Sequence, residues 1–180
     1  MTDVKTFTGT AKALHWILAF LIILEIIFGL RLEDVTGTAR LEKLMGHSGV
    51  GLLILMLVIF RIIWVRKNPA PALPSTMSDR QKKLATINTR VLYGLMVYQP
   101  TIGLLHAATY AKGDVRPFGL FNLTALLPSS EAVTKVFHVM HALGAFLFIF
   151  VIVLHVVAAL KHLVIDKDRV VQRMLPFGKG

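Results

Sequence analysis

Apolar residues along the chain are gathered into four long blocks with short polar stretches between them. The blocks run over about residues 13–30, 47–65, 91–110 and 136–160, and the third is the least apolar. Each is close to the roughly 20 residues that a helix needs to cross the hydrocarbon core of a bilayer. Because a backbone in lipid must satisfy its own hydrogen bonds, we predict an all-α membrane four-helix bundle.

Turn-forming residues separate the blocks. The connections contain residues 33–37, 68–74 and 128–130, which are rich in Gly, Pro, Ser and acidic side chains. Pro100 lies inside the third block and predicts a kink there. Four crossings use nearly all of the chain, so we predict a single transmembrane domain over residues 1–180 without a separate catalytic domain.

The composition argues against several classes of protein and cofactor. Apolar residues make up 55% of the chain and the mean hydropathy is +0.67, whereas soluble domains are typically about 45–50% apolar. An ordinary soluble enzyme, a coiled coil and a disordered chain are therefore disfavoured. The chain has no cysteine, which excludes disulfides, thiolate metal sites, iron–sulfur clusters and covalently attached c-type haem.

The net charge of +10 is mainly a topology signal and not a nucleic-acid footprint. Thirteen Lys and Arg residues fall in the N-terminal stretch, the second connection and the C-terminal tail, against six in the other two connections. The positive-inside rule then predicts that both termini are cytoplasmic. The first block is too long for a signal-peptide core and no Ala-x-Ala site follows it, so we expect a retained helix.

Histidines are the main candidates for chemistry. Polar groups inside a membrane are costly and usually mark function, although a single buried imidazole is as often a structural hydrogen bonder. Several imidazoles at matching depths are harder to explain as structural. The chain has seven: His15, His47, His106, His138, His141, His155 and His162.

Two of these histidines share one face of the fourth block. His141 and His155 are 14 residues apart, which at about 100° per residue is 40° short of four turns, with a rise of about 21 Å. One ring is expected near the outer surface and the other toward the cytoplasm. His138 is rotated by about 100° from His155, so we interpret it as an interfacial residue.

Each histidine of the fourth block has a partner at its own depth. His15 begins the first block from the cytoplasmic side and is level with His155, and His47 begins the second block from outside and is level with His141. Two imidazole pairs without thiolates suit haem iron best. Zinc is the alternative, although a structural zinc site usually has four ligands.

Other residues near these histidines have both functional and structural interpretations. Arg61, 14 residues after His47, either pairs with a propionate of the inner haem or extends to the cytoplasmic surface. Nearby glycines either admit a flat macrocycle or allow close helix packing; they are Gly46, Gly49, Gly51 and Gly144.

Four further side chains also have both functional and structural interpretations. Glu25, inside the first block, either orients a ligand imidazole, relays a proton or makes a structural hydrogen bond. His106 is a spare outer ligand, a donor-site residue or an interfacial side chain. Trp16 and His162 either hold a quinone head group beside the inner haem or form an ordinary interfacial pair.

The combined motifs resemble the bacterial cytochrome b561 family of small di-haem membrane cytochromes. The resemblance spans nearly the whole chain. It rests on Leu14-His15-Trp16, Gly46-His47 through Gly51 to Arg61, Pro100 to Gly103, His141, Leu154-His155 through His162, and Asp168 through Arg173-Met174-Leu175-Pro176.

The resemblance implies two b-type haems with bis-histidine ligation, His15 with His155 for the inner and His47 with His141 for the outer haem. It also implies the bacterial inner membrane, electron exchange with quinone, and superoxide as a donor. Four basic residues are then expected to attract the anion: Arg31, Lys43, Lys112 and Arg116. Two alternatives remain, a haem-bearing anchor for a dehydrogenase or hydrogenase, and a non-redox haem or metal carrier.

Overall fold

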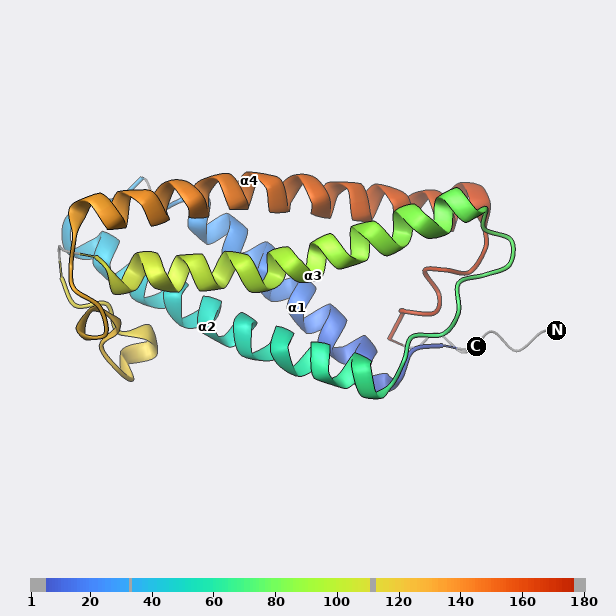
Figure 1. The fold of residues 1–180 in the computed structure, drawn as a ribbon, viewed down its shortest axis with the longest axis horizontal. Coiled ribbons are helices and arrows are strands. Elements are labelled where there is room, and N and C mark those ends of the chain that lie inside the picture. The colour runs from blue at the N-terminus through green and yellow to red at the C-terminus, as the bar shows by residue number, and fades with distance from the viewer. Residues whose placement is uncertain (1–5, 33, 111–112, 177–180) are drawn as a thin grey trace.

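The computed structural model describes residues 6–32, 34–110 and 113–176. They form four long α-helices, and the described part of the chain contains no strand, which confirms the predicted all-α fold class (Figure 1). A π-helical turn continues the last helix, and two short 3₁₀ turns lie in the connection before it. The elements are α1 (Gly9–Leu30), α2 (Gly37–Lys67), α3 (Asp79–Ala108), η1 (Pro117–Gly119), η2 (Leu123–Ala125), α4 (Glu131–Lys161) and η3 (His162–Asp166).

The helices begin earlier than the apolar blocks. The largest differences are at α2 and α3, which begin at Gly37 and Asp79, because a hydropathy block marks only the part of a helix that suits lipid. Polar caps define the true starts. Ser78 and Gln81 form a reciprocal capping box at α3, and the Thr8 hydroxyl accepts from the backbone N–H of Ala11 at α1.

Three of the helical segments are long and apolar enough to cross a membrane. They are α1, α2 and the continuous stretch 131–166 formed by α4 and η3. The less apolar α3 lies alongside them and continues through Pro100, so that proline does not interrupt the helix. Large apolar side chains such as Phe20 and Phe150 are exposed, as expected for a surface that faces lipid.

The bundle is closely packed along only some of its edges. Close backbone contacts join α1 with α2, α2 with α3, and α3 with α4, whereas α4 is not among the closely packed neighbours of α1 or α2. Apolar residues from all four helices, including Leu18, Val58, Leu95 and Phe148, form the central core. The space that separates α4 from α1 and α2 is therefore spanned by side chains and not by close helix contact.

Candidate functional site

The structure brings four of the histidines together as two pairs. The ring centroids of His15 on α1 and His155 on α4 are 6.3 Å apart, and those of His47 on α2 and His141 on α4 are 6.1 Å apart. The start of α1 and the end of α4 lie at one end of the bundle, and the start of α4 lies at the other (Figure 1). The two pairs are thus at different depths, as the spacing predicts.

The distance within each pair suits two imidazoles on opposite sides of one metal ion. A metal–nitrogen bond of about 2 Å on each side, plus ~1.2 Å from nitrogen to ring centre on each side, separates the two centroids by about 6.4 Å. Both pairs have this spacing, and both bridge helices that are not closely packed. Two neutral imidazoles per site are a donor set that haem iron accepts, so the residues present fit a haem.

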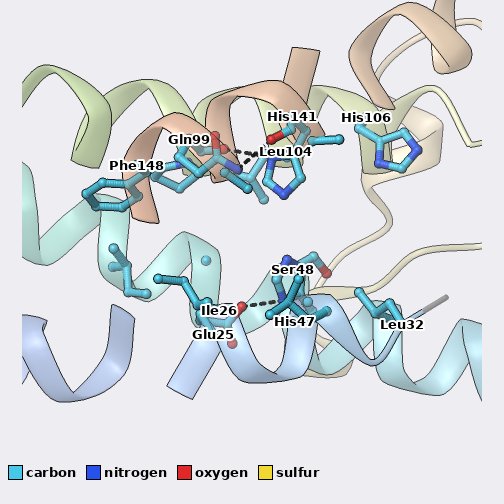
Figure 2. A pocket seen from close by; sticks show the side chains of 18 of the residues that line it. Glu25, Ile26, Leu32, His47, Ser48, Gln99, Leu104, His106, His141 and Phe148 are labelled. Atoms are coloured by element: carbon cyan, nitrogen blue, oxygen red, sulfur yellow. Dashed lines mark hydrogen bonds and ion pairs between the residues drawn. The ribbon is translucent and has the colours of Figure 1, made fainter. Parts of the chain in front are cut away.

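A cavity of about 330 Å³ surrounds the His47–His141 pair. In Figure 2, His141 and Gln99 lie on one side of the cavity, and His47 and Glu25 lie on the other. Most of its lining is apolar, and its few polar groups converge from different helices. Such a cavity is the usual form of a cofactor site.

The Nδ1 atoms of both outer rings already have a neighbour. Nδ1 of His47 lies 2.5 Å from Oε2 of Glu25, and Nδ1 of His141 lies 3.2 Å from the backbone oxygen of Gln99. The side-chain amide of Gln99 also donates to the backbone oxygen of His141 at 2.8 Å. Nε2 is therefore the nitrogen that each ring has left for a metal.

Two glycines that sequence reasoning missed make room for these rings. A Cβ at Gly103 would lie 2.8 Å from Cε1 of His141, and a Cβ at Gly29 would lie 3.3 Å from Cε1 of His47. Their only signal in the sequence is position, since Gly29 follows Glu25 by one helical turn and Gly103 belongs to the Pro100–Gly103 motif. Small residues are needed where an imidazole crosses so close to a helix backbone.

The glycines considered from the sequence have different roles. A Cβ at Gly49 would lie 2.9 Å from the ring of Phe118, and one at Gly144 would meet Tyr98 and Gln99, so both serve packing. Gly51 lines the cavity and faces open space. Gly46 also has nothing near its Cβ position but does not line the cavity.

Arg61 is buried, so it does not extend to the cytoplasmic surface. Its Nε donates to the hydroxyl of Tyr93 at 3.0 Å, and its Nη1 donates to the backbone oxygen of Ala11 at 2.5 Å. Ala11 lies one helical turn before His15. The guanidinium therefore joins α2 to α1 and α3 beside the inner pair, where a cofactor carboxylate would find a positive charge.

His138 and His106 form a third imidazole pair, with ring centroids 5.4 Å apart. Both rings line the outer cavity, together with Tyr110 and Arg40. His138 thus lies opposite His106, while His141 lies opposite His47.

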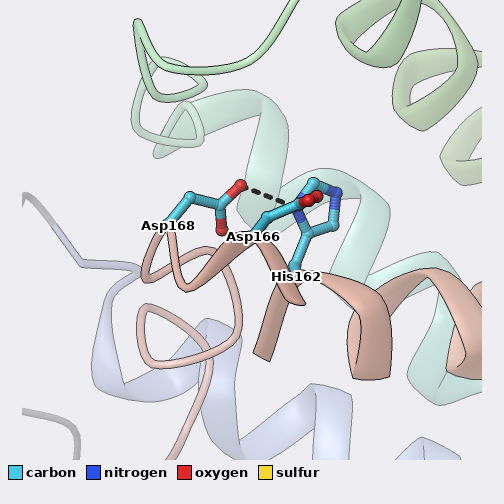
Figure 3. A group of neighbouring side chains, drawn as sticks. All are labelled: His162, Asp166 and Asp168. Carbon is cyan, nitrogen blue, oxygen red and sulfur yellow. Dashed lines mark hydrogen bonds and ion pairs between the residues drawn. The ribbon is translucent and has the colours of Figure 1, made fainter. Parts of the chain in front are cut away.

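Trp16 and His162 both contact the C-terminal region. The indole of Trp16 donates to the backbone oxygen of Met174 at 2.9 Å. Nδ1 of His162 lies 2.6 Å from Asp168 and 3.3 Å from Asp166 (Figure 3). Lys161 already pairs with Asp166, so this cluster is a network of charged groups at the end of α4, and the two acids are partners that sequence reasoning missed.

The basic residues expected to attract an anion are only partly available. Arg31 and Lys43 are exposed, and Lys112 lies outside the described residues. Arg116 donates to Asp114 at 3.2 Å. This hydrogen bond, with a second from Asn122, lowers the pKa of Asp114 below its ordinary acidic value, and the ionised carboxylate offsets the charge of Arg116.

Comparisons with known proteins place these features in a family. A model of the prokaryotic cytochrome b561 family matches residues 6–177. The chain is 30% identical to a probable superoxide oxidase CybB of Yersinia pestis, over 98% of this chain and 99% of that protein. It is 28% identical to cytochrome b561 homolog 2 of Escherichia coli K12, over 94% of this chain and 95% of that protein.

Proposed function

The chain belongs to the prokaryotic cytochrome b561 family, and we propose on this premise that it is a transmembrane di-haem cytochrome that passes electrons from an outer donor to quinone. Family membership makes it a haem-containing oxidoreductase of a bacterial membrane. Two haems per chain, their four ligands and quinone as acceptor belong to the proposal. So does a single domain over residues 1–180 with both termini in the cytoplasm.

The observation that carries the proposal is that four histidines form two imidazole pairs, each at its own depth in the bundle. Their centroid distances of 6.3 Å and 6.1 Å suit bis-histidine iron. Haems held by two histidines each would leave no iron position for a substrate, so they would supply outer-sphere electron transfer only. The chain supports this role by holding His15 with His155 and His47 with His141.

Other side chains would surround the two haem sites and keep water away from them. Leu18, Val58 and Phe148 belong to the apolar core of the bundle, which excludes water from its centre. Arg61 presents a buried positive charge beside the inner pair for a haem propionate. Trp16 and His162 are our candidates for the quinone site, because His162 and its partner Asp168 bring a hydrogen-bonding network to the cytoplasmic end of α4.

Superoxide is our candidate for the donor. One relative that aligns over nearly the whole chain is named a probable superoxide oxidase. Arg31 and Lys43 are exposed near the outer cavity's end of the bundle and would attract a small anion. The electron would then leave on the cytoplasmic side, where quinone reduction also takes up protons.

The test uses the purified chain in lipid nanodiscs. We expect two haem b per chain by pyridine haemochrome, reduction of both by enzymatically generated superoxide, and reoxidation by a short-chain ubiquinone. A folded but colourless protein would refute the proposal. Haems that superoxide does not reduce, but that a co-purified dehydrogenase or hydrogenase does, would instead identify a membrane anchor.

A further inference from the structure

We propose that Glu25 is a positioning residue for the outer haem, where its carboxylate holds Nδ1 of His47, directs Nε2 toward the iron and lowers the midpoint potential of that haem. This inference rests on the proposed function, because it concerns the haem that His47 and His141 would hold. It goes further because a lower potential at the outer haem would favour electron flow from the outer haem to the inner one.

Glu25 is a carboxylate in an otherwise apolar membrane span. It is the one acidic residue of α1, and its side chain is 11% exposed. A charged group at such a position is costly unless it has a partner. Its partner comes from another helix, since Oε2 lies 2.5 Å from Nδ1 of His47 (Figure 2).

This contact determines which nitrogen of His47 can bind a metal. A carboxylate beside Nδ1 keeps the ring proton there and leaves the lone pair on Nε2. Carboxylate partners of this kind orient ligand imidazoles and make them stronger electron donors. A stronger donor, with a negative charge behind it, stabilises ferric over ferrous iron.

The other ligand rings lack this negative partner. Nδ1 of His141 faces a neutral backbone oxygen of Gln99, and among the described residues no carboxylate contact is found at His15 or His155. The charged group near the inner pair is instead Arg61, which is bonded to the carbonyl of Ala11. A positive charge there favours ferrous iron, so an electron passing from the outer to the inner haem moves toward higher potential.

The experiment is a spectroelectrochemical titration of the full chain in nanodiscs. In Glu25→Gln we expect the outer haem to titrate at a higher potential than in the wild type, and the inner haem at an unchanged potential. The highest g value of the outer ferric haem should also change in the electron paramagnetic resonance spectrum. His141→Ala, which is expected to lack the outer haem, identifies the redox wave of the inner haem.

The matched control is Glu42→Gln, which removes one negative charge from an exposed position near the start of α2, the end of that helix that carries His47. This variant should leave the potentials of both haems unchanged. A Glu25→Gln protein with two haems and wild-type potentials would overturn the inference. If Glu25→Gln loses the outer haem, Glu25→Asp decides: an outer haem retained at low potential supports the role, and its absence overturns it. A wild-type chain without two haems would refute the proposed function instead.

Discussion

The ring of His138 pairs with His106 on α3, at a centroid distance of 5.4 Å, although His138 is only three residues from His141 on α4. His141 is opposite His47 at 6.1 Å. We therefore expect His141→Ala to lose the outer haem and His138→Ala to keep both. The measurement is the haem-to-protein ratio of each purified variant, with one haem per chain expected for His141→Ala and two for His138→Ala.

His106→Ala serves as the matched control, because it removes the partner of His138 without touching the proposed ligands. It should also retain two haems. If His138→Ala and His106→Ala each lose one haem while His141→Ala keeps two, the outer ligand assignment is wrong and the third imidazole pair binds the iron.

Gly103 is predicted to be essential to the outer site for steric reasons. A Cβ there would lie 2.8 Å from Cε1 of His141, a distance that forces the ring or the α3 backbone to move. We expect Gly103→Ala to reduce the content of the outer haem and to shift the absorption band of whatever outer haem remains. Optical spectra and haem content of the purified variant measure both effects.

Gly46→Ala is the control for Gly103→Ala. Its Cβ would meet nothing within 4 Å, and alanine stabilises a helix interior by about 0.5–1 kcal/mol relative to glycine. This variant should keep both haems and unfold at a slightly higher temperature. Equal haem loss in both variants would show that the effect comes from the helix and not from the contact with His141.

The fold and the two histidine pairs could be predicted because both follow from local regularities. Helix geometry gives a fixed rotation and rise per residue, so His141 and His155 share a face wherever the helix lies. The alternation of chain direction across the membrane then sets which rings are level. His15 and His47 followed from that alternation without any knowledge of packing.

The contacts that refine the outer site could not be predicted in this way. The approach of Glu25 to His47 and the fit of His141 against Gly103 depend on how each helix is rotated about its axis. That rotation is a result of packing among all the helices. The starts of α2 and α3 were missed because polar helical turns outside the lipid carry no hydropathy signal.

Arg61 is expected to stabilise the bundle as well as the inner site. It joins three helices through Tyr93 and the carbonyl of Ala11, and a hydrogen bond to a charged group contributes about 1.5–3 kcal/mol. We predict that Arg61→Gln lowers the unfolding temperature of the haem-loaded protein and lowers the inner haem potential. Thermal melts followed at the haem absorption band, together with a redox titration, measure the two effects.

Tyr93→Phe separates these two roles. It removes one of the hydrogen bonds of Arg61 and retains the positive charge, so we expect a smaller loss of stability than in Arg61→Gln, about 1.5–3 kcal/mol for one bond to a charged group, with the inner potential nearly unchanged. An Arg61→Gln protein with wild-type potentials would show that the guanidinium is purely structural.

The rate at which superoxide reduces the haems should depend on the charged groups around Arg116. Asp114, whose pKa the hydrogen bond from Arg116 lowers further below neutrality, is ionised at neutral pH and repels an approaching anion. We predict that superoxide reduces the haems of Asp114→Asn faster than those of the wild type in low-salt buffer. Stopped-flow absorbance of the haems measures this rate. The difference should vanish near 1 M salt, where the screening length is about 3 Å.

The control is Asp79→Asn, which removes an exposed acid at the opposite end of the bundle and should be reduced at the wild-type rate. If Asp114→Asn is also reduced at the wild-type rate at every salt concentration, electrostatic guidance of the donor is excluded.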